Sequence, residues 1–518
     1  MQFQLALIVS LVTAINALKI LVALDLGTRS HVVPFFNVAK LLHDRNHTIA
    51  YTAPTKYKKY QKGYDFMQFV PLGEYPPDEM EQINRWVHLP SDINTIVSNF
   101  ALLQDMFAKT YAITAADYDR VFNETKPDLI LCDFFSKSCM DVAHFRGFNY
   151  AVIGAPLGFD GWQAQWYIPS ILNAVPQKEW ITNPVLRVSN TIKILWAARK
   201  LVTIFPSAYT RIQKNTWGTT PPTFSQHLTH RLVLTHSIVG LTPSQPAPPN
   251  VLSLGPLLDP SSQTLDQDMN NFFNQPGTER VIYISFGSGL KALGSLNNRI
   301  LVGLKPILDA YADVSIVWSC PDSNCMSLVE EFIPESQRHR VMMRKWMDQI
   351  AVLKHEKVKL FITHGGISSI HEAVYFGVPL LVVPIFGDQP INALNVVSNG
   401  IGLRIQDKAT MQAIEVTEKV ETLLKTMTTQ NKSSHPVLNL QKVQNMKTLA
   451  RFNRETSLLA GANAMEIAAR IGVDHLIPAN EKFSTWEVMG LGRVKLGWGS
   501  FVALMAGLGA LLATFPKK

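Results

Sequence analysis

The feature that most constrains the fold is the alternation of short, strongly apolar runs with longer amphipathic stretches such as residues 33–45. This alternation is typical of β-α-β units, whose parallel strands are buried on both faces. In the first half of the chain, such runs predict strands at residues 19–25, 47–53, 128–133 and 150–154. In the second half they predict strands at residues 280–287, 314–320, 340–346, 358–365 and 379–386. The sequence therefore predicts an α/β protein with two parallel sheets.

A proline-rich segment at residues 243–262 separates the two sets of strands. The segment contains one short strand pattern, and the prolines around it indicate a linker. At 518 residues the chain is long enough for two lobes. We expect a first lobe over residues 18–242, a second over 263–437, and C-terminal helices over 438–475 that pack back on the first lobe.

Both ends of the chain have the composition of targeting segments. Residues 1–17 join an apolar stretch to small residues, which predicts a secretory signal peptide; the alternative is a first strand extended backwards. Residues 496–515 carry no charge and are long enough to cross a bilayer as a helix; the alternative is a buried C-terminal helix. Together they predict a single-pass type I glycoprotein of the endoplasmic reticulum membrane with a lumenal body. Glycosylation sequons at Asn46, Asn123 and Asn431 agree with this placement.

Charge and cysteine content exclude two further classes of protein. The net charge of +8 comes from 48 basic and 40 acidic residues, and the basic residues do not cluster as a nucleic-acid-binding face requires. Four cysteines are too few for a disulfide scaffold. In an oxidising lumen Cys132, Cys139, Cys320 and Cys325 could pair, but Cys132 is equally a core thiol, so the pairing stays open.

The densest group of polar residues follows the strand at 358–365. The strand ends at His364, Gly365 and Gly366 make a tight turn, and a helix is expected from about Ile367 to Phe376. Such a turn presents free backbone N–H groups at the positive end of a helix dipole, which suits a diphosphate. Glu372, one turn inside the helix, is better placed to accept hydrogen bonds from ribose hydroxyls. No dinucleotide fingerprint follows any strand, which argues against a dehydrogenase.

Here the sequence resembles the family 1 UDP-glycosyltransferases. The resemblance rests on the signature segments WMDQIAVL (346–353), THGGISSIHEAVYFGVP (363–379) and DQPINA (388–393). Residues 30–42 and 285–288 and both terminal segments also fit, whereas residues 160–240 resemble the family least. The resemblance implies a GT-B fold, in which two Rossmann-like lobes face a cleft and the second lobe binds most of the UDP-sugar donor.

The resemblance also implies which residues contact the neutral parts of the donor. Trp346 would stack on the uracil, and Gln349 would contact the base or the ribose. Glu372 would bind the ribose hydroxyls, in agreement with its place on the helix. Asp388 and Gln389 would bind hydroxyls of the transferred sugar.

A second group of residues would hold the diphosphate. The resemblance assigns this role to His364, Ser369 and the backbone N–H groups near Gly366, with Ser288 from the facing loop. Because these groups can stabilise the charge of departing UDP, we expect no metal and no other cofactor.

The candidate general base lies in the first lobe. His31 follows the first strand, where an isolated histidine is usually a surface or capping residue. Asp133 ends another strand of the same half, and the carboxyl ends of neighbouring parallel strands meet at one sheet edge. The family has its catalytic histidine and the aspartate partner at these positions, so the resemblance implies that His31 accepts the acceptor's proton. The competing Asp128 precedes its strand, at the wrong end of the sheet.

The expected reaction is an inverting transfer of a hexose, glucose in preference to glucuronic acid, to the hydroxyl of a small acceptor. Trp162, Trp166 and Tyr167 indicate a lipophilic acceptor, although ordinary loop packing explains them equally well. The main alternative is a non-catalytic UDP-sugar-binding or lectin-like protein, which would be expected to lack His31 or the Asp388–Gln389 pair. A hydrolase would release free sugar, and an epimerase would need a nicotinamide fingerprint.

Overall fold

The computed structural model describes residues 17–25, 27–74, 93–155, 179, 182–204, 208–243, 247–261, 264–287, 294–321, 325–428 and 438–477. The apolar run at 496–515, nearly all of the expected signal peptide and the sequon at Asn431 lie outside these residues. Within the described residues, no helix is long and apolar enough to cross a membrane. Asn46 and Asn123 are both exposed.

The first lobe contains a parallel sheet of seven strands in the order β3-β2-β1-β4-β5-β6-β7. The strands are β1 (Lys19–Ala23), β2 (Thr48–Ala53), β3 (Gln68–Pro71), β4 (Leu129–Asp133), β5 (Tyr150–Ala155), β6 (Leu232–His236) and β7 (Val251–Leu254). All four strands expected in this half are present. The edge strand β7 lies within the proline-rich segment expected to be a linker, so this segment completes the first sheet before it leads to the second.

Helices cover both faces of this sheet, as the fully apolar strands require. They are α2 (Arg29–Asp44), α4 (Ile93–Thr125), α5 (Lys137–Arg146), α7 (Pro184–Ile204), α8 (Ala208–Trp217), α9 (Phe224–Thr229) and the 3-10 helix η1 (Thr55–Gln61). The side chains of β1 alternate between the two faces. Ile20 and Val22 join the core beneath α2, and Leu21 and Ala23 join the core beneath α4 and α5.

The second lobe contains a parallel sheet of six strands in the order β10-β9-β8-β11-β12-β13. The strands are β8 (Arg280–Ser285), β9 (Val314–Ser319), β10 (Val341–Arg344), β11 (Val358–Thr363), β12 (Leu380–Val382) and β13 (Gly402–Arg404). The helices are α10 (Gln267–Asn274), α11 (Ser295–Ala310), α12 (Cys325–Phe332), α13 (Glu335–Arg338), α14 (Gln349–Lys354), α15 (Ile367–Phe376), α16 (Gln389–Ser398) and α17 (Ala413–Thr428). The five strands expected in this half are present, and one large apolar core holds the lobe together.

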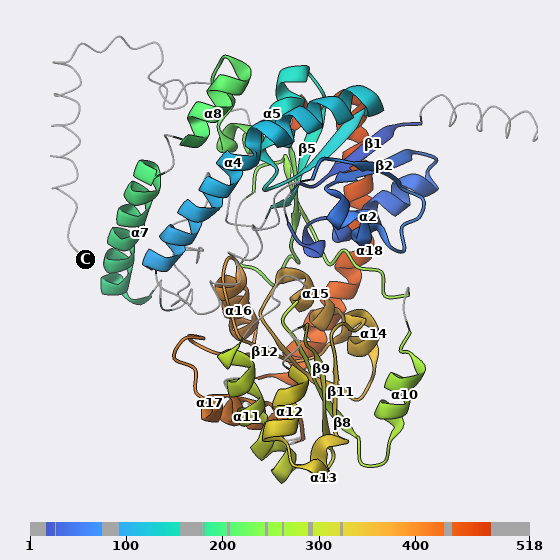
Figure 1. The fold of residues 1–518 in the computed structure, drawn as a ribbon, viewed down its shortest axis with the longest axis vertical. Coiled ribbons are helices and arrows are strands. Elements are labelled where there is room, and N and C mark those ends of the chain that lie inside the picture. Colours follow the sequence, from blue (N-terminus) through green and yellow to red (C-terminus); the bar gives the residue numbers. More distant parts are fainter. Residues whose placement is uncertain are drawn as a thin grey trace, which may run out of the picture.

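In each sheet the strand order reverses at one point. The first sheet grows in opposite directions from β1 and β4, and the second from β8 and β11. Parallel α/β sheets bind ligands beyond the carboxyl ends of the strands at such a switch point. The fold therefore has one candidate site edge in each lobe, and Figure 1 shows the lobes one above the other.

The long helix α18 (Leu440–Ile471) connects the two lobes (Figure 1). It packs against α15 of the second lobe and against α2 and β7 of the first. The Arg454 side chain donates a hydrogen bond to the carbonyl of Leu258, at 2.7 Å. At Gly461 the helix lies so close to the first lobe that a Cβ atom would be 2.9 Å from Cδ1 of Leu254. A short 3-10 helix, η3 (Asp474–Leu476), follows.

All four cysteines form disulfides. Cys132 at the end of β4 pairs with Cys139 on α5, and Cys320 pairs with Cys325. The pairing that the sequence leaves open is therefore local in both lobes. The first pair connects the strand that ends in Asp133 to the helix that follows it.

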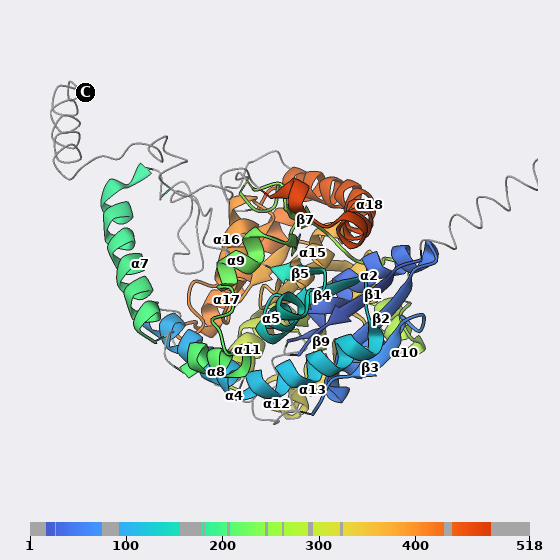
Figure 2. The same cartoon turned by 90° about the horizontal axis from the view of Figure 1, so that it is seen from above.

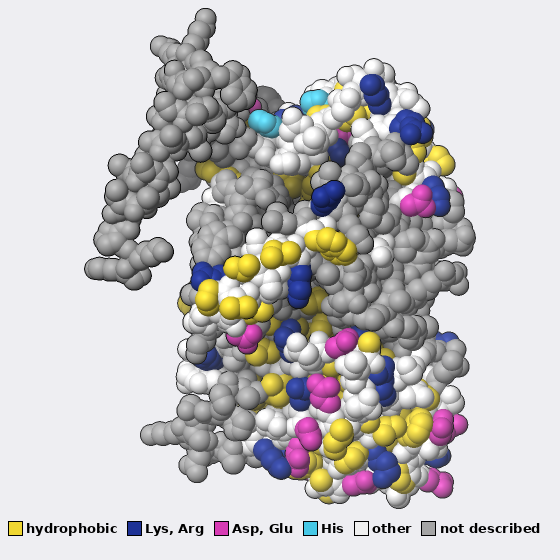
Figure 3. Space-filling model, turned by 90° about the vertical axis from the view of Figure 1, so that its left-hand side faces the viewer, with side chains coloured by type: hydrophobic (Ala, Val, Ile, Leu, Met, Phe, Trp, Pro, Cys, Tyr) yellow, Lys and Arg dark blue, Asp and Glu magenta, His cyan; other side chains and the backbone are white. Residues whose placement is uncertain are grey.

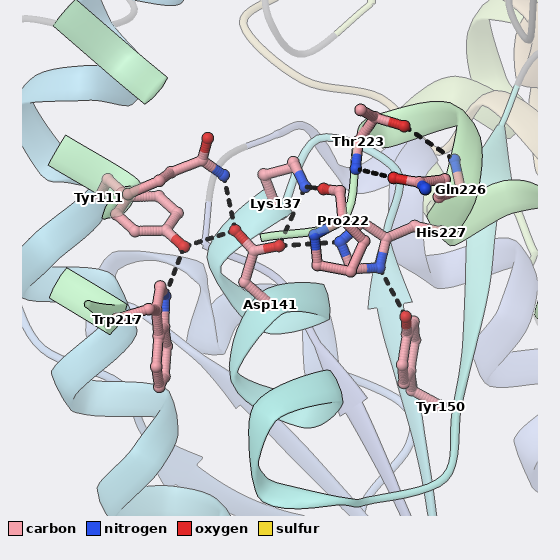
Figure 4. A network of polar contacts seen from close by, with 10 residues as sticks. Tyr111, Lys137, Asp141, Tyr150, Trp217, Pro222, Thr223, Gln226 and His227 are labelled. Carbon is pink, nitrogen blue, oxygen red and sulfur yellow. Dashed lines mark hydrogen bonds and ion pairs between the residues drawn. The ribbon is translucent and has the colours of Figure 1, made fainter. Parts of the chain in front are cut away.

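A buried polar network ties α4, α5, α8 and α9 to β5 in the first lobe (Figure 4). The Asp141 carboxylate on α5 is fully buried and accepts hydrogen bonds from the side chains of His227, Lys137, Gln213 and Tyr111. The Tyr150 hydroxyl bonds to Nδ1 of His227. Because the Asp141 carboxylate is only an acceptor, His227 donates to it from Nε2, at 2.8 Å, and accepts from Tyr150 at Nδ1.

This network fixes the ionisation of its members. Burial lowers the pKa of His227 to about 4, so the ring is neutral at physiological pH. Burial opposes ionisation of Asp141, but the hydrogen bond from His227 and the charge of Lys137 outweigh it and lower the pKa of that carboxyl. An ionised buried carboxylate with four donors is costly to disrupt, because its partners cannot find water instead.

We expect Asp141→Ala to lower the free energy of unfolding of the first lobe by roughly 3–5 kcal/mol, because it leaves Lys137 as an unpaired buried charge. The matched control is Asp119→Ala, which removes an ion pair to Arg146 whose side chains are 28% and 49% exposed. That change should cost less than about 1 kcal/mol. Urea unfolding of both variants measures the difference. Equal losses would show that the network adds no special stability.

Candidate active site

The first half of the site is a pair of side chains at the switch point of the first sheet. His31 lies in the first turn of α2, just after β1, and Asp133 is the last residue of β4. Their side chains meet with Nδ1 of His31 3.0 Å from Oδ1 of Asp133. The other oxygen of Asp133 accepts the backbone N–H of Phe135, also at 3.0 Å. A carboxylate can only accept, so Nδ1 carries the proton and Nε2 of His31 is left as the basic nitrogen.

The surroundings of the pair determine how exposed the His31 side chain is and how its pKa is shifted. Asp133 is fully buried, whereas the His31 side chain keeps 22% of its surface exposed. Gly154 has a φ of +76°, and a Cβ atom there would lie 3.3 Å from Oδ1 of Asp133. Burial disfavours the charged imidazole, but the charge of Asp133, the hydrogen bond to it and the charge of Asp388 raise the pKa of His31 above 6.5.

The second half of the site is the turn between β11 and α15. His364 follows the strand, and Gly366 is the N-cap residue of the helix, as the sequence predicts. The imidazole of His364 lies between two glycines: a Cβ atom at Gly287 would be 2.8 Å from the ring, and one at Gly366 would be 2.5 Å from it. Burial lowers the pKa of His364 to about 4, so the ring is neutral and can donate one N–H beside the helix N-terminus.

Three residues that are predicted to bind the UDP-sugar donor form a hydrogen-bonded cluster between α14 and α15. Nε2 of Gln349 donates to Oε2 of Glu372 at 2.6 Å and to Oγ of Ser369 at 3.1 Å. Burial raises the pKa of Glu372 to about 7, although the Gln349 hydrogen bond opposes this rise. Ser369 is buried, and its hydroxyl accepts this hydrogen bond from Gln349.

The residues expected to bind the transferred sugar lie at the start of α16. Asp388 accepts a hydrogen bond from Nδ2 of Asn392 at 2.6 Å, and burial raises the pKa of Asp388. Gln389 is buried, and its Oε1 accepts the backbone N–H groups of Ile385 and Phe386 at 2.8 and 3.0 Å. Gln389 therefore offers a ligand mainly its NH₂ group, whereas Asp388 offers carboxylate oxygens.

Of the two remaining residues predicted to bind the UDP-sugar donor, the structure describes Trp346 but not Ser288. The Trp346 side chain, just before α14, is 70% exposed and so leaves a ring face free for stacking. Ser288 lies outside the described residues, as do Trp162, Trp166 and Tyr167.

Charge interactions link the candidate groups of the two lobes. The charge of Asp388 in the second lobe contributes to the raised pKa of His31, and the charge of His31 opposes the rise in the pKa of Asp388. The charge of Arg29, in the first turn of α2, likewise acts across the lobes and opposes the rise in the pKa of Glu372. The sequence interpretation assigned no role to Arg29 or Asn392. Arg29 is two residues before His31, and Asn392 lies within the signature segment. Their proximity to these motifs is the sequence feature that could have identified them.

We expect Asp133→Asn to lower the titration midpoint of His31 by about 1–3 pH units, because an amide removes the negative charge that favours the imidazolium. The His31 ring signal in an NMR titration from pH 4 to 9 measures this. Asp128→Asn is the control, since Asp128 accepts the backbone N–H of Lys19 at the opposite end of the strand. The proposed coupling is wrong if Asp133→Asn leaves the midpoint where it is in the wild type.

Comparison with known proteins agrees with this geometry. Residues 90–451 match the profile of the family described as UDP-glucoronosyl and UDP-glucosyl transferase. The chain is 24% identical over 434 residues to UDP-glycosyltransferase FPY2 of Fusarium mangiferae, covering 78% of this chain and 77% of that protein. It is 24% identical over 417 residues to the human 2-hydroxyacylsphingosine 1-beta-galactosyltransferase, covering 78% and 72% of the two chains.

The fold is similar to a solved UDP-glucosyltransferase from Polygonum tinctorium that glucosylates indoxyl. The TM-score is 0.59 at 16% identity, over 87% of this chain and 99% of that one. The two parallel sheets, each with its switch point, are thus those of a GT-B fold. With the family profile matched over most of the chain, the protein belongs to the UDP-glycosyltransferase family and is a hexosyltransferase that uses a UDP-sugar.

Proposed function

We propose that this enzyme transfers a hexose, with glucose preferred, from a UDP-sugar to a hydroxyl of a small lipophilic acceptor with inversion at the anomeric carbon. The observation that carries the proposal is the His31–Asp133 pair at the edge of the first sheet. The charge interaction of His31 with Asp388, a residue proposed to hold the sugar, supports this assignment. A non-catalytic binder has no need of a polarised histidine at this position.

The proposed chemistry uses Nε2 of His31 as the general base. The acceptor oxygen forms a bond to the anomeric carbon while the bond from that carbon to the β-phosphate oxygen breaks. The acceptor proton moves to Nε2, and UDP leaves with the bonding electrons. Asp133 keeps the proton of the resting imidazole on Nδ1 and stabilises the imidazolium that forms.

The negative charge of departing UDP would be stabilised by the turn after β11. The N-terminus of α15 and the neutral His364 ring can both donate hydrogen bonds to the β-phosphate. Trp346 would stack on the uracil, and Glu372 with Gln349 would bind the ribose hydroxyls. Because these donors already supply the stabilisation, we propose that turnover needs no metal and survives EDTA.

Two similarities support the choice of sugar and acceptor. The Polygonum protein is a UDP-glucosyltransferase, and the human relative transfers galactose to a sphingosine derivative. Both transfer neutral hexoses, and the second has a lipophilic acceptor. We therefore prefer a neutral hexose over glucuronic acid, and glucose among the hexoses.

Attachment to a lumenal membrane surface would suit such an acceptor. We propose a type I topology, with residues 1–17 as the signal peptide and 496–515 as the anchor. The exposed Val185, Val188 and Ile192 of α7 are consistent with a nearby lipid surface, at 76%, 61% and 61% exposure. With Pro184 and Ser189 they line a shallow hollow. Figure 2 shows α7 at the outer edge of the molecule, and Figure 3 shows hydrophobic side chains in a band on that side.

We expect His31→Ala to lower kcat by roughly 10²–10⁴-fold and to leave UDP affinity almost unchanged. His43→Ala is the control, because His43 is exposed at the other end of the same helix. In the wild type, kcat/KM should rise with pH through a midpoint above 6.5, since the base must be unprotonated and Asp133 raises its pKa. Wild-type turnover by folded His31→Ala would refute the base. Tight UDP-sugar binding without transfer to any acceptor would favour the binder.

We expect deletion of residues from Leu496 onward to release the protein from carbonate-washed membranes, because the deletion removes the uncharged run. Fractionation of membranes from cells that express each form measures the release. A truncated protein that stays in the membrane pellet would show that another segment anchors the chain.

A further inference from the structure

Two buried histidines meet where the first lobe contacts the donor-binding helix. His236 is the last residue of β6, and His371 lies on α15, one residue before Glu372. Nδ1 of His371 is 3.1 Å from Nε2 of His236, and the two rings are nearly perpendicular at 84°. The side chains are buried, with 1% of His371 and 6% of His236 exposed. This hydrogen bond therefore links the two lobes directly.

The hydrogen bond can form only if at least one ring is neutral. It also leaves one nitrogen of each ring without a described partner that could stabilise a positive charge. One imidazole donates to the bare nitrogen of the other. The remaining nitrogens, Nδ1 of His236 and Nε2 of His371, are buried and have no hydrogen-bond partner among the described residues. A proton added to either ring would therefore bring a buried charge and a further unsatisfied N–H group.

The elements packed around the pair supply no compensating charge. Phe35 of α2 lies edge-on to His236, and a Cβ atom at Gly255 would lie 3.1 Å from Cε1 of His371. The hydroxyl of Ser457 on α18 accepts the backbone N–H of Gly255. The neighbouring carboxylate of Glu372 is turned to Gln349.

The ionisation of both rings follows from this setting. Burial alone lowers the pKa of His236, to about 3. Burial, and then the charge of His236, lower the pKa of His371 well below 6.5. No carboxylate on a described residue acts on either ring to restore it.

We propose that His236 and His371 are positioning residues whose neutral pair holds α15, and with it Glu372, against the first lobe, and whose protonation separates the lobes at this junction. The link to Glu372 rests on the proposed function of that residue in binding the donor. The separation itself depends only on the imidazole pair.

The expected size of the effect follows from proton linkage. When the junction opens, water reaches both rings and each regains an ordinary pKa near 6.5. Below that pH, the ratio of open to closed junctions rises up to about 10-fold per pH unit for each imidazole. Between pH 7.5 and 5.5 the ratio should therefore rise by about 10- to 100-fold.

Amide hydrogen exchange of the full-length, ligand-free protein, corrected for the intrinsic effect of pH, measures this opening. In wild type, the protection of the α15 amides should fall by about 10- to 100-fold from pH 7.5 to 5.5. The double variant His236→Phe/His371→Phe removes both titrating groups and keeps the packing, so its protection should change little. His371→Gln, which retains hydrogen bonding without titration, provides a second test if the double variant folds poorly.

Two controls separate this effect from others. His43→Phe changes an exposed histidine and should keep the wild-type response. The network around His227 also responds to acid, but it lies in the first lobe, so its effect appears in α5 and α9 rather than in α15. Constant α15 protection in wild type, or an equal loss in the double variant, would overturn the proposal.

Calorimetric titration with UDP at both pH values tests the link to the donor. UDP affinity should fall with acid more steeply in wild type than in the double variant, because both retain Glu372 and His364 and differ only in the pair. If the junction opens with acid while UDP affinity falls equally in the two proteins, the link to Glu372 is refuted. That result would leave the opening of the lobes established independently of the donor role.

Discussion

The reversal of strand order in each sheet is the constraint on which the site depends. Because the first sheet grows in opposite directions from β1 and β4, the chain segments beyond these strands leave to opposite faces and open a space between them. His31 and Asp133 occupy that position in the first lobe. The same reversal at β8 and β11 places Ser285 and His364 at the corresponding edge of the second lobe. The candidate base and the candidate donor-binding residues therefore lie in different lobes as a consequence of topology.

Burial shifts the pKa of each of three groups in the second-lobe half of the site toward its neutral form. It raises the pKa of Glu372 to about 7 and that of Asp388 above its ordinary value, and it lowers that of His364 to about 4. A diphosphate would bring two or more negative charges to a helix N-terminus that has no acidic residue in its first turn. The first lobe differs, because Asp133 favours the charged form of His31. A diphosphate would thus bring its charge to the helix N-terminus of the second lobe, while the hydrogen-bonded His31–Asp133 pair lies in the first.

The sequence predicts the parts of this structure that depend on local patterns. The apolar runs predict the strands, the Gly365–Gly366 turn predicts the start of α15, and the position of Asp133 at a strand end predicts its approach to His31. Contacts between distant residues carry no such signal. The pair of His236 and His371 spans 135 residues, and neither neighbourhood predicts the other. The cysteine pairing is local, yet the sequence did not decide it. Cys132 lies in a buried strand, where an unpaired core thiol was as good an interpretation as a disulfide.

The orientation of buried polar side chains is the other feature that sequence does not predict. Gln389 is part of the signature segment, but its side-chain oxygen accepts hydrogen bonds from the backbone N–H groups of Ile385 and Phe386. The Ser369 hydroxyl accepts a hydrogen bond from Gln349, on another helix. Which of several acceptors a side chain chooses depends on packing from other elements. The resemblance therefore proposes the residues of the site, and the structure shows the hydrogen bonds that Gln389 and Ser369 make.

The central claim is a single displacement at the anomeric carbon, assisted by a base in the lobe opposite the donor. The most direct test is the anomeric configuration of the product formed by the wild-type protein from α-linked UDP-glucose and a phenolic or sterol acceptor, read from the proton coupling of the new glycoside by NMR. The account predicts a β-glycoside, because one displacement inverts the centre. An α-glycoside would require a second displacement or a different attacking face, and release of free glucose alone would mean that no acceptor is activated. Either result would contradict the account.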